Sequence, residues 1–175
     1  MRRSWARAVV AVAQKQDLPG SIVRRKSPVF FEQSHPSYTV LDFEYSNLTE
    51  EIPKELGFMR ELSYLHLWNN PLTGQLPTSL GNLSKLSFLS SNKNSLSGSV
   101  PETLANIRAL NVLKLFDNNF TGSLDFLSSI SNCGQLQDLD LSSNSFMITG
   151  GLPDHVGNLS TKLFEFHAGY NNLVG

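Results

Sequence analysis

The side chains that could perform chemistry are few and scattered along this sequence of 175 residues. The carboxylates of Asp138 and Asp140 alternate on a predicted strand and share a face, as a general acid–base pair can. No nucleophile, base and orienting group accompany them, so a solvated acidic patch is the favoured interpretation. The histidines lie too far apart in sequence for the short ligand spacing of zinc sites, at His35, His66, His155 and His167. We therefore expect no enzyme, no cofactor and no metal.

Cysteine content and charge exclude two further classes of site. The single cysteine, Cys133, cannot form an internal disulfide or a cysteine-based zinc site, and we expect a buried structural thiol. Residues 1–37 hold seven Lys or Arg against two Asp or Glu, whereas residues 38–175 hold seven against thirteen. A mildly acidic main body binds phosphate poorly, so we expect no nucleic acid partner.

Residues 38–175 repeat a single pattern, L-x-x-L-x-L-x-x-N-x-L-x-G-x-[IVL]-P. The clearest copy runs from Leu62 to Pro77, and the last copy ends at Gly175 before its proline. Proline and glycine in phase with the leucines exclude a leucine-rich helical bundle. The asparagine position recurs at spacings of 24, 24, 24, 26 and 27 residues, at Ser46, Asn70, Asn94, Asn118, Asn144 and Asn171.

The leucine spacing predicts a solenoid in which each copy forms one coil. Alternation directs Leu65 and Leu67 inward from a short strand, while His66 and Trp68 point outward. One coil cannot bury its own leucines, but stacked coils can, and each buried side chain contributes roughly 1.5–3 kcal/mol. We predict an α/β solenoid, a right-handed leucine-rich-repeat horseshoe of about six 24-residue coils. A parallel β-sheet would line its concave face, and short 3-10 or irregular segments would form its convex face.

Two sets of side chains acquire roles from this geometry. Equivalent asparagines would bond backbone groups at the turns and form a structural ladder, from Asn70, Asn94, Asn118, Asn144 and Asn171. Outward side chains would form columns, because neighbouring strands lie about 4.7–4.9 Å apart. Exposed aromatic residues there are the usual anchors of recognition, although scattered surface aromatics need no partner. The candidate ligand-binding residues are Tyr64, His66, Trp68, Phe88, Asn92, Lys114, Phe116 and Asp140.

Four N-x-[ST] sequons are candidate glycosylation sites, at Asn47, Asn82, Asn119 and Asn158. In a secreted chain we expect glycans at these positions, on turns or on the outer face. The alternative is that the repeat itself generates N-L-S and N-L-T, and that an unsecreted chain carries no glycan.

The 24-residue period with G-x-[IVL]-P resembles the plant-specific leucine-rich repeats of receptor-like kinase ectodomains, over residues 38–175. Two strings, residues 124–133 and 151–163, are similar to the cereal subfamily of the bacterial-blight resistance receptor kinase and its relatives, the flagellin and elongation-factor-Tu receptors. The resemblance implies a microbial or peptide ligand, a co-receptor ectodomain as a further partner, a plasma-membrane location and immune signalling. The sequence lacks the paired-cysteine cap and the kinase motifs V-A-I-K, H-R-D and D-F-G, so we expect a receptor fragment without the kinase.

Residues 1–37 match no repeat, and we expect a basic, poorly ordered segment ahead of a repeat domain at 38–175. Met1 to Ala13 begins like a secretory signal, but Arg7 limits the apolar stretch to six residues, fewer than the roughly 7–15 that such signals use. No apolar run reaches the length of a membrane helix, so we expect no membrane insertion by this chain itself. A location that is secreted, or on the outer face of the plasma membrane, depends on the resemblance to receptors.

Two other functions fit the same repeat. A secreted inhibitor or decoy, similar to the polygalacturonase-inhibiting proteins, would block a microbial enzyme through its surface. Such an inhibitor is expected to carry a complete signal peptide and both disulfide caps. A non-functional gene remnant would aggregate through its open sheet edge. The favoured hypothesis is a module that binds a peptide or protein ligand.

Overall fold

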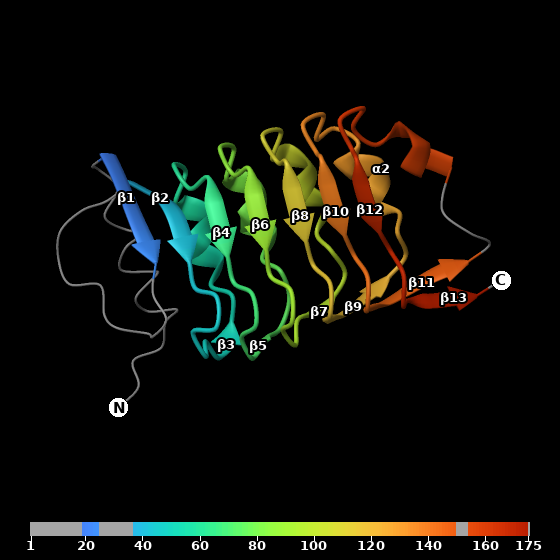
Figure 1. The fold of residues 1–175 in the computed structure, drawn as a ribbon, viewed down its shortest axis with the longest axis horizontal. Helices are drawn as coiled ribbons and strands as arrows, with labels where there is room; N and C mark the ends of the chain where they lie inside the picture. Colours follow the sequence, from blue (N-terminus) through green and yellow to red (C-terminus); the bar gives the residue numbers. More distant parts are fainter. Residues whose placement is uncertain (1–18, 25–36, 150–153, 175) are drawn as a thin grey trace.

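The computed structural model describes residues 19–24, 37–149 and 154–174, which form a stack of coils (Figure 1). Each coil contributes one strand to a parallel sheet of seven strands in the order β1-β2-β4-β6-β8-β10-β12. The strands are β1 (Pro19–Arg24), β2 (Ser37–Asp42), β4 (Tyr64–His66), β6 (Phe88–Ser90), β8 (Val112–Lys114), β10 (Asp138–Asp140) and β12 (Glu165–His167). We call the outward side chains of β2, β4, β6, β8, β10 and β12, together with those of the three residues after each strand, the sheet face.

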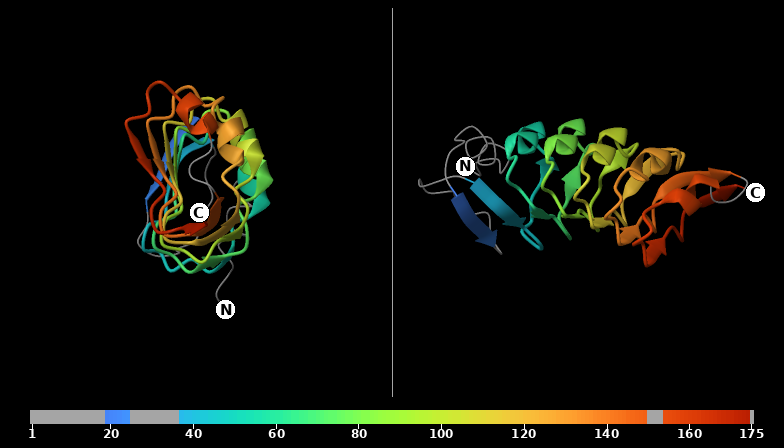
Figure 2. Two further views of the ribbon diagram at one scale, coloured as in Figure 1. Left: turned by 90° about the vertical axis from the view of Figure 1, so that its right-hand side faces the viewer. Right: turned by 90° about the horizontal axis from the view of Figure 1, so that it is seen from above.

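Two further layers complete each coil, and Figure 2 shows the short helices along the edge opposite the large sheet. The helices are η1 (Lys54–Phe58), η2 (Thr78–Asn82), η3 (Glu102–Asn106), α2 (Phe126–Ile130) and η4 (Asp154–Asn158). Short parallel strands line the lower edge in Figure 1, as the pair β3-β5 and the sheet β13-β11-β9-β7. They are β3 (Glu50–Glu51), β5 (Leu72–Thr73), β7 (Ser97–Gly98), β9 (Asn119–Gly122), β11 (Ser145–Thr149) and β13 (Asn172–Val174).

The strand register places equivalent leucines side by side in the core. Leu65 lies opposite Leu89, and Leu89 lies opposite Leu113, with all three side chains fully buried. Because strands in one register share their inward face, each leucine packs between its counterparts in the neighbouring coils. The predicted leucine-rich-repeat solenoid with a parallel sheet is confirmed.

One coil departs from the expected 3-10 or irregular segments on the helical side. Pro53, Pro77 and Pro101 precede η1, η2 and η3 with an extended backbone, at ψ between 129° and 133°. In the 26-residue coil Asp125 stands in the proline position, and its backbone is already helical at ψ −28°. The additional residues and the missing proline therefore allow an α-helical turn, α2, at this position.

The ladder asparagines bond four backbone groups each, except Asn70, which bonds five. Asn118 is representative. Its Oδ1 accepts from the Leu96 N–H at 3.0 Å, and its Nδ2 donates to the carbonyl oxygens of Ser91, Leu115 and Phe116 at 3.0–3.3 Å. Two of these contacts are within the coil, and the other two reach into the preceding coil. The asparagines thus fasten each turn to its neighbour while satisfying buried backbone groups.

The residue before each ladder position adopts a left-handed backbone conformation, which the sequence pattern did not reveal. Its φ lies between 50° and 56° at Tyr45, Asn69, Lys93, Asp117, Ser143 and Tyr170. Only Asn and Asp accept this conformation readily among non-glycine residues, and four of the six positions carry other types. The turn therefore comes from the stacked coils and their asparagines, and not from local preference.

Strand β1 extends the sheet beyond the repeat region. It pairs in parallel with β2, where Val23 lies opposite Leu41. Residues 1–18 and 25–36, including His35, lie outside the described residues. The boundary that we place between residues 37 and 38 stays a prediction.

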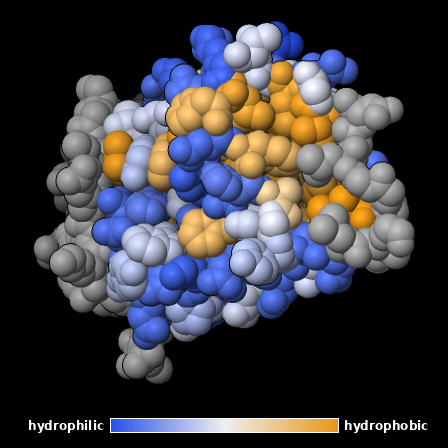
Figure 3. All heavy atoms as spheres, turned by 45° about the vertical axis from the view of Figure 1, so that its right-hand side comes forward, coloured by the Kyte–Doolittle hydropathy of each residue, from blue (hydrophilic) through white to orange (hydrophobic). Residues whose placement is uncertain are grey.

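The C-terminal side of the stack presents apolar side chains at its surface, as Figure 3 shows. Phe164 is 71% exposed, while Leu163 and Phe166 are only partly buried against the core. Equivalent side chains in earlier coils, such as Leu136 and Leu139, are fully buried beneath the following coil. Of the described helices, none has the length and apolar character needed to cross a membrane.

Candidate ligand-binding face

An aromatic cluster occupies the first three coils of the sheet face. The rings of Tyr64 and Phe88 stack with centroids 4.2 Å apart, and Tyr45 meets the ring of Trp68 edge-on at 4.8 Å. The imidazole of His66 lies between the two pairs, 5.6 Å from Phe88 and 6.2 Å from Trp68. Phe88 reaches Tyr64 and His66 across strands because β4 and β6 bring residues far apart in sequence into one register. We call these five residues the aromatic cluster.

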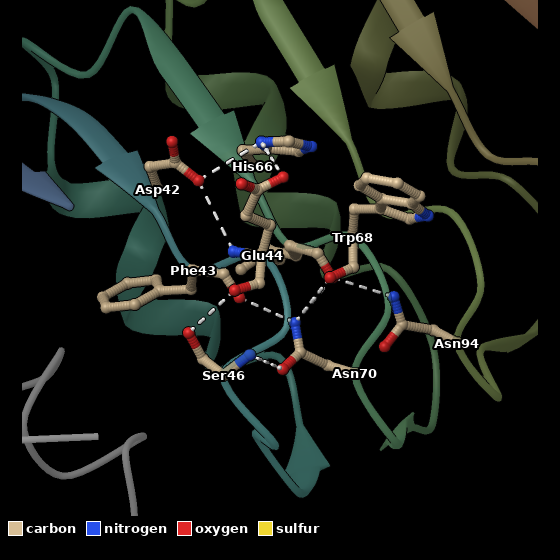
Figure 4. A network of polar contacts seen from close by, with 9 residues as sticks. Asp42, Phe43, Glu44, Ser46, His66, Trp68, Asn70 and Asn94 are labelled. Carbon is tan, nitrogen blue, oxygen red and sulfur yellow. Dashed lines mark hydrogen bonds and ion pairs between the residues drawn. The ribbon is translucent and has the colours of Figure 1, made fainter. Parts of the chain in front are cut away.

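His66 also connects the aromatic cluster to two carboxylates of the first coil (Figure 4). Its Nδ1 lies 3.2 Å from Asp42 Oδ1 and 3.9 Å from Glu44 Oε2. The Asp42 carboxylate also accepts the Glu44 backbone N–H at 3.4 Å. These contacts orient the imidazole ring, and with it the surface that the cluster presents.

A charged group occupies the fourth and fifth coils. Lys114 Nζ lies 2.6 Å from Asp138 Oδ2, and the lysine side chain is 30% exposed. Asp140 Oδ1 accepts hydrogen bonds from the backbone N–H and the hydroxyl of Ser142, at 3.0 and 2.6 Å. Both carboxylates therefore have defined orientations, and the acid–base chemistry considered above lacks a third reacting group beside them.

The eight predicted ligand-binding residues all lie on the sheet face, but they do not form one cluster. The structure brings together Tyr64, His66, Trp68 and Phe88, and all four side chains are half-buried by their mutual contacts. Phe116 is half-buried too, but it meets none of the other rings in the described part of the chain. Lys114 and Asp140 belong to the charged group, and Asn92 is buried.

Sequence reasoning left out five residues that contribute to the site, namely Asp42, Glu44, Tyr45, Lys93 and Asp138. Each of the five belongs to a column of outward positions. Their position beside Trp68, His66 or Lys114 in these columns could therefore have identified them from the sequence. Lys93, for example, places Nζ 5.9 Å from the centroid of the Trp68 ring. The left-handed turn directs Tyr45 and Lys93 toward this ring, which the sequence pattern alone does not predict.

Three polar atoms of the sheet face are buried without a hydrogen-bond partner among the described residues. They are Trp68 Nε1, Asn92 Oδ1 and Asp138 Oδ1. Such groups destabilise the folded protein. They lie beneath the surface, so the face presents to a partner the edges and faces of its aromatic rings and its charged side chains.

The remaining reactive groups do not form a second site. Cys133 is buried, and this burial raises the pKa of its thiol to about 11, so the group stays protonated. Its Sγ lies 3.4 Å from the carbonyl oxygen of Ile107, a structural contact between coils. Within the described ranges, no three side chains of His, Cys, Asp or Glu gather in a way that could hold a metal ion.

Comparison with known proteins agrees with this fold. The family model named Leucine Rich Repeat matches residues 61–83 and 135–159. A search among curated proteins finds no match. Fold and repeat together make the described chain a leucine-rich-repeat domain.

Solved structures that resemble this domain are ectodomains of plant receptors. The plant peptide hormone receptor RGFR1, in complex with RGF2, superposes with a TM-score of 0.73 at 29% identity, over 79% of this chain and 23% of that chain. The ectodomain of the receptor kinase GASSHO1/SCHENGEN3 from Arabidopsis thaliana was solved in complex with CASPARIAN STRIP INTEGRITY FACTOR 2. It superposes with a TM-score of 0.72 at 34% sequence identity, over 79% of this chain and 17% of that chain. A chain of the BIR3–SERK2 complex from Arabidopsis thaliana superposes with a TM-score of 0.69 at 28% sequence identity, over 83% of this chain and 74% of that chain.

The chain is thus a leucine-rich-repeat module that resembles the ectodomains of plant receptor kinases. It spans 23% and 17% of the length of the first two receptors. The comparisons give no greater support to a secreted inhibitor or to a gene remnant.

Proposed function

We propose that this chain binds a peptide or protein ligand on its sheet face, as part of the ectodomain of a plant cell-surface receptor. The observation that carries the proposal is the aromatic cluster, which joins three coils of the sheet face. RGFR1 and SCHENGEN3 were each solved in complex with a partner, which supports a binding role. The resemblance of residues 124–133 and 151–163 to the cereal resistance receptors supports an immune role at the plasma membrane.

The geometry favours an extended ligand that crosses several strands. Adjacent strands lie about 4.8 Å apart, so each coil offers a new contact to about one and a half residues of extended chain. The stacked rings of Tyr64 and Phe88 and the ring of Trp68 would supply apolar contact area to the ligand. A co-receptor ectodomain would approach the same face or the edge beside it, as a second protein partner.

Replacing Trp68 and Phe116 with alanine is expected to remove ligand binding and leave the fold intact. Hot-spot aromatic residues contribute about 2 kcal/mol or more each, which corresponds to roughly thirtyfold in Kd per residue. The probe is a peptide enriched from a library of random dodecapeptides displayed on phage against the wild-type chain, with Kd measured by fluorescence anisotropy. Phe58→Ala, a change of a 49% exposed ring at the end of η1, is the matched control.

The control variant should bind like the wild type, and thermal unfolding should show all three proteins folded. If the Trp68→Ala, Phe116→Ala double variant keeps the wild-type Kd, the sheet face is not the binding surface. If no peptide is enriched above background on the wild-type chain, the proposed function itself is wrong.

We also propose that the module carries N-linked glycans away from the sheet face. All four sequon asparagines are exposed, and none lies in a strand of the large sheet; Asn82, for example, ends η2 on the helical side. Expression through the secretory pathway of plant cells should yield a chain whose mass falls on treatment with a peptide-N-glycosidase. Asn82→Gln should lose one glycan mass, whereas Asn106→Gln, at the equivalent exposed end of η3 but outside a sequon, should not. An unshifted wild-type mass would contradict the proposal.

A further inference from the structure

We propose that this chain forms a symmetric dimer in which strand β12 of one copy pairs antiparallel with β12 of a second copy. The dimer does not depend on the proposed ligand, because it uses the opposite end of the sheet from the aromatic cluster (Figure 1). Among the described strands, β12 is the last in the order of the large sheet, so its outer edge has no neighbour. Three properties of this edge favour a second copy: its apolar surface, its backbone groups and its charges.

An aromatic side chain stands at this edge where the earlier coils carry a polar one. The residue directly before β4, β6, β8 and β10 is polar in each case, namely Ser63, Ser87, Asn111 and Gln137. Before β12 it is Phe164, whose side chain is 71% exposed. Leu163 and Phe166 are only partly buried, and apolar surface gathers on this side of the stack (Figure 3). Because burial of apolar area drives association, this surface favours a protein partner.

The backbone of β12 directs hydrogen-bonding groups to its open edge. Successive residues of a strand direct these groups to opposite edges. Glu165 N–H donates to the carbonyl oxygen of Gln137 at 3.2 Å, and the carbonyl oxygen of His167 accepts from the N–H of the fifth coil's Leu141 at 2.8 Å. Glu165 and His167 therefore bond toward the preceding coil. Phe166 lies between them, so its N–H and C=O point toward the open edge.

A two-fold axis at Phe166 satisfies these groups. In an antiparallel pair centred there, the Phe166 N–H of each copy donates to the Phe166 carbonyl oxygen of the other. Phe164 and Ala168, two residues away on either side, lie opposite each other across the axis, so the Ala168 N–H can donate to the Phe164 carbonyl oxygen. An unpaired edge strand is a template for pairing, and β12 is here its own complement.

The charged side chains of β12 are also self-complementary. Glu165 and His167 are exposed on the sheet face, with Oε2 and Nε2 4.0 Å apart within one chain. The two-fold axis places Glu165 of each copy directly opposite His167 of the other, and the imidazole can donate a hydrogen bond to the facing carboxylate. Opposite charges in such cross-strand pairs stabilise a sheet, and like charges destabilise it. Parallel pairing in register, by contrast, would bring the two Glu165 carboxylates together.

Antiparallel pairing joins the two large sheets into one. Paired strands keep their side chains on common faces, so the two sheet faces lie on the same side of the dimer. The aromatic clusters of the two copies then lie at the two ends of one continuous sheet.

Sedimentation equilibrium of the full chain at several concentrations measures the association. The mass should rise from 19.4 kDa toward twice that value, with a Kd on the order of 10 μM as expected for a small interface. Phe164→Ser introduces the residue type that the second and third coils carry at this position. It should raise Kd about tenfold or more, because both copies lose a ring. Phe58→Ser, a change of a 49% exposed ring at the end of η1, is the matched control and should dimerise like the wild type.

A charge reversal and its rescue test the antiparallel register. His167→Glu places two carboxylates opposite each other on both sides of the axis, so Kd should rise about tenfold. Adding Glu165→Lys to this variant restores opposite charges across the axis, and Kd should return to within about threefold of the wild-type value.

Amide hydrogen exchange locates the paired groups. The N–H groups of Phe166 and Ala168 should exchange more slowly as the concentration rises through Kd, because pairing protects them. The Leu141 N–H, which is already bonded within the chain, should show no such dependence.

The remaining outcomes overturn the dimer. A wild type that stays monomeric at about 100 μM contradicts it. So does a dimer that tolerates both Phe164→Ser and His167→Glu, because another surface then forms the contact. Failure of Glu165→Lys to rescue His167→Glu rules out the antiparallel register, and oligomers that grow beyond two copies indicate head-to-tail stacking of coils. The proposed function stands in each of these cases, because peptide binding is measured separately.

Discussion

The variant Asn118→Ala is expected to lose about 3 kcal/mol of unfolding free energy, although the substitution removes only a small polar side chain. The reason lies in the hydrogen bonds of the ladder. The Leu96 N–H donates to Asn118 Oδ1 at 3.0 Å, so the substitution leaves a buried backbone donor without an acceptor. An orphaned donor of this kind costs about 1–3 kcal/mol. The space left by the amide adds a cavity cost.

The substitution costs less hydrogen bonding at the carbonyl groups around Asn118 than at this N–H donor. Ser91 O also accepts from Asn94 Nδ2 at 2.9 Å, and Leu115 O also accepts from Asn144 Nδ2 at 3.0 Å. Each therefore keeps one partner in the variant. Most of the lost unfolding free energy therefore comes from one unpaired N–H group and from weaker contact between two coils.

Urea denaturation of the wild type, of Asn118→Ala and of Asn106→Ala measures this effect. Asn106 is exposed at the end of η3, and its replacement should change the free energy of unfolding by less than about 0.5 kcal/mol. Equal midpoints for the two variants would show that the ladder does not hold the coils together.

The second large effect is expected for Gly81→Ala, which should destabilise the chain by about 2–3 kcal/mol through overpacking. A Cβ atom at residue 81 would lie 2.3 Å from the backbone carbonyl oxygen of Thr103 in the next coil. Because the obstructing atom belongs to the backbone, no side-chain rotation relieves the clash. The two coils must separate, which weakens the leucine packing between them.

The chain contains a matched control for this substitution. Gly157 occupies the equivalent position of η4, and a Cβ there would meet nothing within 4 Å. Gly157→Ala should therefore be neutral, or stabilise slightly because alanine restricts the unfolded chain. Thermal unfolding of both variants tests the pair, and equal melting temperatures would contradict close coil-to-coil contact at Gly81.

The equivalent residue of the third coil shows why this contact depends on the neighbour. Ala105 stands there in the natural sequence, and the coil that follows carries α2 in place of a 3-10 segment. A methyl group is accommodated against that different helix. The glycine requirement is thus set by the next coil along the stack, and the residue's own coil does not determine it.

The sequence predicts which side chains lie on the sheet face better than it predicts their contacts. The register of His66, Trp68 and Phe88 on one face follows from period-2 alternation and from the 24-residue repeat. The same argument places Phe116 on this face, but the structure shows no contact between its ring and the other rings in the described part of the chain. Ring contacts depend on side-chain torsions and on the twist between coils, and a repeat period contains neither.

The sequence by itself determined the number of coils, the parallel sheet, the inward leucines and the positions of the asparagines. Each of these depends on residue type at a fixed spacing, which is local information repeated along the chain. Only the tertiary structure decided the left-handed turns at residues such as Lys93, the α-helical turn at Phe126–Ile130 and the burial of Asp138 beside Lys114. These features arise between residues about one coil apart, where packing against a neighbour outweighs the preference of each residue alone.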